Sequence, residues 1–384
     1  MAKILVISTR YPNIIHKTNH IFVQQLVWAL SDLGHKCIVV SPIARNINSD
    51  LNEKIAEVSI EINDNGKEIK ILYPRYCSLS KHKYLMGIEN KATLKNYYKS
   101  ILKAVNMIDF KPDLVYGHFI DPAGITASRI GRILNIPAYF AYGESTLWSI
   151  KKYRKKWLKK ELASVKGVIA VSNKNKDILV EQALIDKNKI GVFPNAVRKQ
   201  HFYKRNKSES RRFFGFDNKE FIVSFVGQFN KRKGVDRLDK AVEELEGVKA
   251  IYAGKGAIKP RSKKTLYCDI VEPNEMPLFL SASDVFVLPT INEGCSNAII
   301  EAMACGLPII SSDLSFNYDI LDENNSIMVN PMDVSQIKNS ILTIKDNIDL
   351  REKMGRSSLE KSALLNYEDR ARNIMNWIMG KNCH

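Results

Sequence analysis

Two glutamates, Glu293 and Glu301, frame the stretch of this chain whose residue types are best suited to chemistry. Between them lies the segment Gly-Cys-Ser-Asn-Ala-Ile-Ile, and the short apolar run 284–289 precedes them. An apolar run of this length predicts a buried parallel strand. The glycine and serine after Glu293 then predict the start of a helix, which Gly306 and Pro308 close. The sequence therefore predicts a strand, a loop and a helix that together carry two carboxylates.

The start of this helix is predicted to bind an anion. The first N–H groups of a helix have no acceptor within the helix, and the positive end of the helix dipole lies there. Asn297 and Glu301 are four residues apart and share one helix face, whereas Glu293 lies on the loop above it. Carboxylates are ill suited to binding phosphate but well suited to accepting hydrogen bonds from sugar hydroxyls. The pattern therefore favours a ligand in which a phosphate lies between two sugars.

The composition is that of a globular protein with two domains. The chain has 384 residues, of which 45% are hydrophobic and 26% are charged, which suffices for two substantial cores. No run reaches the roughly 18 apolar residues that span a bilayer, and the apolar start of the chain is too short for a signal peptide. The six cysteines show no metal or disulfide spacing. These observations predict a reduced, cytoplasmic protein.

The formal net charge is +17. Nucleic acid, an anionic membrane face or an anionic substrate would attract such a chain, while a lysine-rich coding bias would raise the charge without any partner. The densest basic run is 151–160, where Tyr153, Trp157 and Leu158 form part of an apolar stripe at helical spacing. Two interpretations follow: the stripe packs on the protein's own sheet with the lysines in water, or the helix makes a peripheral contact with the anionic inner face of the plasma membrane.

Strands and helices alternate along both halves of the chain, which predicts a parallel, doubly wound sheet in each half. In the first half we expect strands at 3–8, 36–41, 58–62, 68–73, 114–117, 138–141 and 167–171, and helices at 22–33, 94–106 and 124–134. In the second half we expect strands at 221–226, 248–253, 284–288 and 308–312. Turn-forming sequence at 190–196 and polar sequence at 198–219 place a domain boundary near residue 197, and an amphipathic helix at 366–379 closes the chain.

Taken in order, these features resemble the glycosyltransferase family 4 enzymes, in particular the subgroup that makes capsular and teichuronic-type polysaccharides. Besides the two glutamates, the resemblance rests on the glycine-loop and lysine block 227–235, the Pro-Asn-Ala-Val linker 194–197, the Asp-Leu-Val-Tyr-Gly-His segment 113–118 and the segment 312–319. It runs over nearly the whole chain. It implies an α/β fold of the GT-B type, with two Rossmann-like doubly wound domains facing across a cleft. The implied parts are an acceptor-binding domain at 1–196, a nucleotide-sugar-binding domain at 197–365 and a helix at 366–384 that packs back on the first domain.

The resemblance implies a role for each residue of the nucleotide-sugar site. Glu301 would bind both ribose hydroxyls, and Glu293 would contact hydroxyls of the transferred sugar. Lys233 would neutralise the diphosphate leaving group, a charge-assisted contact worth about 1.5–3 kcal/mol that strengthens as the glycosidic bond breaks. With this lysine and a helix terminus in place, no metal ion and no other cofactor is expected. The remaining contacts to the nucleotide-sugar are expected at Gly227, Gln228, Arg232, Gly294, Cys295, Ser296, Asn297 and Ile270.

His118 is the implied catalytic residue of the N-terminal domain. It follows a predicted strand and so lies at the edge where open α/β sheets bind ligands. The resemblance implies that it contacts the sugar or the reacting centre. The reaction is expected to retain the anomeric configuration, either by front-face attack or through a covalent intermediate.

The chain departs from the family pattern at several places. Gln228 stands where the family usually has arginine, so that Arg232 or Lys231 would have to supply the missing charge. His20 lies in a loop where many members have two glycines, and Tyr142 and Glu144 flank a glycine where the family has a His-Gly pair. His20, Tyr142 and Glu144 are therefore the candidate acceptor-binding residues.

The expected activity is hexosyl transfer from a UDP- or GDP-sugar to a glycan or polyprenyl-linked acceptor in surface polysaccharide biosynthesis. Two alternatives share the fold: a sugar-nucleotide epimerase, which would lack the paired glutamates, and a glycan phosphorylase, which would be much longer and carry a pyridoxal-phosphate lysine. A basic nucleic-acid-binding protein is a third alternative. The sequence contains no helix-turn-helix, zinc finger or basic sheet interleaved with aromatic residues, so that no nucleic-acid partner is expected.

Overall fold

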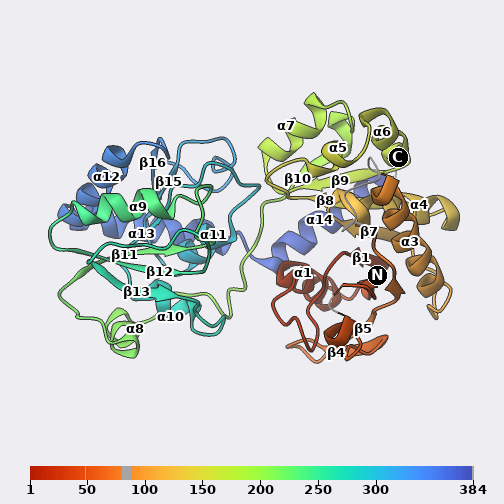
Figure 1. Cartoon of the computed structure of the whole chain (residues 1–384), viewed down its shortest axis with the longest axis horizontal. Helices are drawn as coiled ribbons and strands as arrows, with labels where there is room; N and C mark the ends of the chain where they lie inside the picture. Colours follow the sequence, from red (N-terminus) through yellow and green to blue (C-terminus); the bar gives the residue numbers. More distant parts are fainter. Residues whose placement is uncertain (48, 80–87, 383–384) are drawn as a thin grey trace. The chain divides into compact units, whose positions relative to one another are not determined.

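The structure is a computed structural model that describes residues 1–47, 49–79 and 88–382. The chain forms two compact units, each with its own sheet covered by helices (Figure 1). The first unit comprises Met1–Phe193 and Tyr367–His384, and the second comprises Pro194–Asn366. The closing segment of the chain thus belongs to the first unit.

The first unit is built on an eight-stranded sheet in the order β10-β9-β8-β7-β1-β2-β5-β4. Its strands are β1 (Lys3–Ser8), β2 (Lys36–Val40), β4 (Val58–Ile62), β5 (Glu68–Leu72), β7 (Leu114–His118), β8 (Ala138–Tyr142), β9 (Gly167–Ala170) and β10 (Ile190–Val192). Every neighbouring pair is parallel except β4 and β5, which are antiparallel. A separate two-stranded sheet joins β3 (Ile43–Ala44) and β6 (Arg75–Tyr76).

Helices cover both faces of this sheet. They are α1 (Ile21–Asp32), α2 (Ser49–Asn52), α3 (Ile88–Val105), α4 (Ile125–Leu134), α5 (Trp148–Lys152), α6 (Lys155–Leu162), α7 (Asn173–Glu181) and α14 (Tyr367–Asn382), with a π-turn at Ile120–Gly124 and a 3-10 turn at Lys187–Lys189. Alternate residues of β1 face opposite sides. Ile4 and Val6 pack in a core with α1 and α14, whereas Leu5 and Ile7 pack in a core with α3 and α4. This two-sided burial explains the continuous apolar run of the strand.

The second unit is built on a six-stranded parallel sheet in the order β13-β12-β11-β14-β15-β16. Its strands are β11 (Phe221–Val226), β12 (Val248–Ala253), β13 (Thr265–Asp269), β14 (Val285–Leu288), β15 (Ile309–Ser312) and β16 (Ser326–Val329). Its helices are α8 (Lys207–Phe214), α9 (Val235–Glu243), α10 (Met276–Ser281), α11 (Asn297–Ala304), α12 (Val334–Asp346) and α13 (Ile348–Ala363). The strand order reverses between β11 and β14. Open α/β sheets bind ligands beyond the carboxyl ends of the strands at such a point.

Most of the strands and helices expected from the sequence are confirmed to within a few residues. The turn-forming segment 190–196 is a correction, because its first three residues form β10 and pair with β9. The sequence also missed β13 and β16. All three strands lie at sheet edges, where a short segment needs only one neighbour. Their existence depends on pairing with a strand that lies far away in the sequence, which a local pattern does not reveal.

The basic segment 151–160 forms two helices rather than one. Tyr153 adopts an extended backbone conformation between α5 and α6. The apolar stripe lies in the unit's own core, where Tyr153, Leu158 and Leu162 are buried and Trp157 packs against them. The lysines of the segment are exposed. Of the two interpretations of the stripe, packing on the protein's own sheet is confirmed, so the stripe is not available to insert into a bilayer.

Across the described parts of the chain, the helices are all too short or too polar to span a membrane.

Two glycine loops pack against each other at the carboxyl edge of the second sheet. Gly227 follows β11 and its N–H donates to the carbonyl oxygen of Ala253 at 3.0 Å. Gly254 follows β12 with φ at +150°, and a Cβ atom on it would collide with the Gly227 carbonyl oxygen. A Cβ atom added to Gly256 would likewise collide with the carbonyl oxygen of Phe229. The Gly-Lys-Gly sequence therefore serves to bring the loop after β12 against the loop after β11.

Replacing Gly254 with alanine should destabilise the protein by about 2–4 kcal/mol, because the change combines an unfavourable φ with overpacking against a backbone oxygen. Gly215→Ala is the matched control. Gly215 has φ at +73°, but a Cβ atom added to it would meet nothing within 4 Å. The Gly215→Ala variant should therefore lose only the stability that the unfavourable φ costs, about 1–2 kcal/mol. Urea unfolding of the two variants measures the difference. Equal losses of stability in the two variants would show that the close contact between the two loops adds nothing to the cost of a Cβ atom at Gly254.

Candidate active site

A cluster of charged side chains lies at the switch point of the second sheet. The Glu293 Oε1 atom lies 2.7 Å from Arg232 Nη1 and 2.5 Å from Lys233 Nζ. The Thr290 hydroxyl donates to the same carboxylate oxygen at 3.2 Å. The side chains of Lys233 and Glu293 are only 13% and 12% exposed. Two cations thus share one anion, which leaves a net charge of about +1 in a partly desolvated place.

Backbone contacts hold the two loops that carry this cluster. The Lys233 N–H donates to Asn230 Oδ1 at 2.9 Å, and the Ile291 N–H donates to the Arg232 carbonyl oxygen at 2.9 Å. The aliphatic part of Lys233 passes over Gly227, where an added Cβ would lie 3.5 Å from its Cδ. The loop after β11 is therefore bonded directly to the loop after β14. Sequence reasoning missed Thr290 and Asn230, whose positions flanking the predicted site residues were the only signal.

The start of α11 contains a buried hydroxyl without a partner. Ser296 occupies the N-cap position, but its side chain makes no capping hydrogen bond. Its hydroxyl is buried and has no hydrogen-bond partner in the described part of the chain. Asn195 Nδ2 donates to the Cys295 carbonyl oxygen at 3.0 Å and to Asn297 Oδ1 at 2.8 Å. The linker residue Asn195 therefore fixes the loop that leads into the helix, and the helix start retains donors that could bind an anion.

Glu301 lies one turn further along α11. Burial raises its pKa to about 7, and the structure shows no ion-pair partner for it within the described residues. A carboxyl in this situation is stabilised when ligand hydroxyls donate to it. The expected pairing of Asn297 and Glu301 on one helix is confirmed.

Two of the predicted nucleotide contacts are engaged with neighbouring residues. Gln228 is exposed and its Oε1 atom accepts from Asn230 Nδ2 at 3.1 Å. The Ile270 N–H donates to Asp269 Oδ1 at 2.7 Å, and the Ile270 carbonyl oxygen accepts from the Tyr267 hydroxyl at 2.8 Å. Asp269 in turn bonds the glycine loop, since its carbonyl oxygen accepts from the Gly254 N–H at 2.9 Å. The hydrogen bond from the Ile270 N–H to Asp269 would have to break before this N–H could donate to the base of a nucleotide.

The predicted residues of the first unit lie at the carboxyl edge of its own sheet. His118 ends β7 and is 6% exposed. Its ring lies 4.6 Å from that of Phe119, 5.1 Å from that of Phe22 and 6.4 Å from that of His20. Burial, with smaller effects of His20 and Arg370, lowers the pKa of His118 well below its usual value. Burial and then Arg10 lower the pKa of His20 to about 4. Both imidazoles are therefore neutral at physiological pH.

Tyr142 and Glu144 lie at the end of the next strand, β8. The Tyr142 hydroxyl and Glu144 Oε2 are buried without hydrogen-bond partners in the described residues. Burial and then Asp121 raise the pKa of Glu144 to about 7, which Lys152 opposes. Asp121 itself accepts from Lys152 Nζ at 2.7 Å and from the Tyr153 hydroxyl at 2.9 Å. The sequence had not singled out Asp121, which adds to the effect of burial on the pKa of Glu144.

The chain matches two family descriptions that divide between its units. Residues 20–201 match Glycosyltransferase Family 4, and residues 220–347 match Glycosyl transferases group 1. A relative in Bacillus subtilis, named as the teichuronic acid biosynthesis glycosyltransferase TuaC, is 24% identical and covers 88% of each chain. An Escherichia coli relative, named UDP-Gal:alpha-D-GlcNAc-diphosphoundecaprenol alpha-1,3-galactosyltransferase, is 27% identical over 68% of this chain and 72% of its own.

The crystal structure of Anabaena HepE in complex with UDP and glucose has the same fold. It superposes with a TM-score of 0.73 at 13% identity, covering 99% of this chain and 100% of HepE. The fold is therefore the GT-B fold. The chain belongs to the family 4 glycosyltransferases, and its relatives act in the biosynthesis of polysaccharides and glycolipids.

The pKa of Glu301 predicts a pH-dependent effect of its replacement. A partly desolvated carboxyl with a raised pKa holds its proton in the folded state, so that its cost to stability is small at pH 4.5 and complete above pH 7. Glu301→Gln carries no such cost. The stability of the variant relative to the wild type should therefore rise by about 2–3 kcal/mol between pH 4.5 and pH 8. Urea unfolding at a series of pH values measures this, and a pH-independent difference would contradict the burial of the carboxyl.

Proposed function

We propose that this protein is a retaining glycosyltransferase that moves a hexosyl group from a UDP- or GDP-sugar to a glycan or lipid-linked acceptor in surface polysaccharide biosynthesis. The observation that carries the proposal is the placement of Lys233 and Arg232 beside Glu293 at the switch point of the second sheet. A nucleotide-sugar presents a diphosphate between two hydroxyl-bearing rings. The cluster, the start of α11 and Glu301 provide groups that suit these three parts of one ligand.

The cluster supplies the charge that the reaction needs. As the glycosidic bond breaks, negative charge develops on the diphosphate, and a fixed ammonium beside it lowers the barrier. Glu293 holds Lys233 and Arg232 in place, and so spares the ligand the entropy of ordering two long side chains. Arg232 would supply the second positive charge that Gln228 does not. The two cations and the helix start perform the task that a metal ion performs in other enzymes, so we propose that the reaction is metal-independent.

The first unit would bind the acceptor. A neutral His118 can exchange hydrogen bonds with a sugar hydroxyl without introducing charge. Glu144 has a pKa near neutrality and an oxygen without a partner, which suits it to accept a hydrogen bond from an acceptor hydroxyl. His20 and Tyr142 would complete these contacts. The proposal of a lipid-linked acceptor is supported by the name of the E. coli relative, whose acceptor is a diphosphoundecaprenol-linked sugar.

Binding of the nucleotide-sugar tests the proposal directly. A panel of UDP- and GDP-sugars should contain one that raises the melting temperature in proportion to ln(1 + [L]/Kd). Glu301→Ala should weaken this binding by at least about tenfold, the loss expected for charge-assisted hydrogen bonds in a buried site. Glu360→Ala, which changes an exposed glutamate of α13 in the same unit, should bind as the wild type does. A fully active Glu301→Ala enzyme, or no stabilisation by any nucleotide-sugar, would refute the assignment.

We also propose a peripheral, mainly electrostatic contact with anionic membrane through α5 and α6. Their lysines are exposed, and Trp148 at the start of α5 is exposed as well, whereas Leu158 and Leu162 are buried in the unit's own core. Each basic residue near an anionic surface contributes about 1 kcal/mol.

Flotation with liposomes tests this contact. The protein should bind vesicles that contain phosphatidylglycerol and should dissociate as salt rises. A variant with Lys155, Lys156, Lys159 and Lys160 changed to glutamine should lose at least about tenfold in affinity. A matched variant with four exposed lysines of the second unit changed, Lys231, Lys240, Lys255 and Lys259, controls for net charge alone. Equal losses of vesicle affinity in the two variants, or binding that does not depend on lipid charge, would refute the proposed membrane contact.

A further inference from the structure

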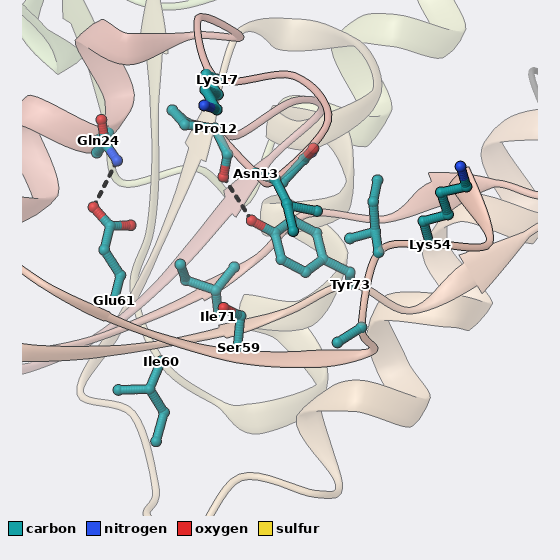
Figure 2. A pocket seen from close by; sticks show the side chains of 13 residues that line it. Pro12, Asn13, Lys17, Gln24, Lys54, Ser59, Ile60, Glu61, Ile71 and Tyr73 are labelled. Carbon is teal, nitrogen blue, oxygen red and sulfur yellow. Dashed lines mark hydrogen bonds between the residues drawn. The ribbon is translucent and has the colours of Figure 1, made fainter. Parts of the chain in front are cut away.

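A pocket of about 460 Å³ lies in the first unit, apart from the residues assigned above. Its walls are the loop that follows β1, the first turns of α1, the edge strand β4 and its neighbour β5 (Figure 2). None of His20, His118, Tyr142 and Glu144 lines it. The loop that forms one wall leads into His20, which precedes α1. The pocket therefore shares a loop with a candidate acceptor contact.

One side of the pocket ends in a fixed carboxylate. Glu61 Oε1 accepts a hydrogen bond from Gln24 Nε2 at 2.6 Å and another from the Trp28 indole N–H. Both bonds reach the same oxygen. Burial raises the pKa of Glu61, which hydrogen bonds from Gln24, Trp28 and Tyr11 oppose. The two donors on α1 thus orient an acceptor toward the pocket.

The middle of the pocket is apolar and rigid. The Tyr73 hydroxyl donates to the Pro12 carbonyl oxygen at 2.7 Å, which ties the end of β5 to the loop after β1. Figure 2 shows the Tyr73 ring beside Ile71, between Glu61 and Lys54. Ligand pockets typically combine such an apolar and aromatic wall with a few fixed polar groups. The flat apolar wall suits the C–H face of a sugar ring.

Two exposed lysines line the pocket, Lys17 on the loop after β1 and Lys54 before β4. Neither makes an ion pair within the described residues. Figure 2 shows Lys54 and Glu61 on opposite sides of the pocket. A ligand that spans it would therefore place hydrogen-bond donors at one end and a negative charge at the other.

We propose that this pocket binds an anionic sugar unit of the acceptor. Its hydroxyls would donate to Glu61, its ring would lie on Tyr73 and Ile71, and its carboxylate or phosphate would lie near Lys54, with Lys17 adding to the positive charge around the pocket. A neutral sugar would leave both lysines without a counter-charge, and a cationic ligand would be repelled by them. The proposal rests on the proposed function in that it names the acceptor of that transferase, but the pocket binds its sugar without the nucleotide-sugar.

Titration by nuclear magnetic resonance in the absence of any nucleotide tests the pocket. The three probes are methyl β-glucuronoside, galactose 1-phosphate and the neutral methyl β-glucoside. At least one anionic probe should bind at least about tenfold more tightly than the neutral one. The probe that does so identifies the anion as a carboxylate or a phosphate. Equal affinities for the charged and neutral probes would overturn the proposal.

Variants locate the binding. Lys17→Ala/Lys54→Ala should remove the preference for the anionic probe, whereas Lys111→Ala/Lys187→Ala, which changes two exposed lysines of the same unit, should retain it. Glu61→Gln should weaken binding of the neutral probe as well as of the anionic ones. Its melting temperature and circular dichroism spectrum should match those of the wild type, which shows that the fold is kept. Retention of the preference in Lys17→Ala/Lys54→Ala would overturn the proposal. Failure of the nucleotide-sugar panel would instead refute the proposed function and leave these titrations unaffected.

Discussion

The sharing of one carboxylate by two cations is the interaction on which the second unit's site depends. Glu293 comes from the loop after β14, and Arg232 and Lys233 come from the loop after β11. These strands are neighbours across the reversal of strand order, so that the ion pairs close the carboxyl edge of the sheet at its switch point. A partly buried charge is stable only with a partner. The cluster therefore determines the spacing of the two loops and leaves a surplus of positive charge there.

The helix that follows this loop carries groups that cost stability. Glu301 is half-buried without an ion-pair partner in the described residues, and the Ser296 hydroxyl is buried without a hydrogen bond. Buried polar groups usually have partners, and exceptions concentrate where a protein binds something. At the neighbouring strand ends, Gly254 and Gly227 are in close contact. The second unit thus combines a well-packed sheet edge with an incompletely satisfied helix start.

The first unit uses burial rather than ion pairing to set its chemistry. Aromatic rings around His118 exclude water and keep its imidazole neutral. At the end of β8, burial and Asp121 bring Glu144 close to half protonation at neutral pH. In the pocket beside β4, burial likewise raises the pKa of Glu61. Two donors on α1 fix the orientation of this carboxylate. A unit with neutral or nearly neutral groups of this kind is suited to hydroxyl-rich ligands rather than to highly charged ones, except where Lys17 and Lys54 lie.

The sequence by itself determined the alternation of strands and helices, the two sheets and the position of Glu301 on α11, because continuous apolar runs and helix-ending glycines are local signals. It also named Glu293, Lys233 and Arg232, but as separate contacts to a ligand. Only the tertiary structure decided that they bind one another, that Thr290 and Asn230 support them, and that β10, β13 and β16 exist. It alone assembled the pocket around Glu61, whose walls lie far apart along the chain. Ion pairs, edge pairing and burial depend on which distant segments meet, and no local pattern of residues encodes that.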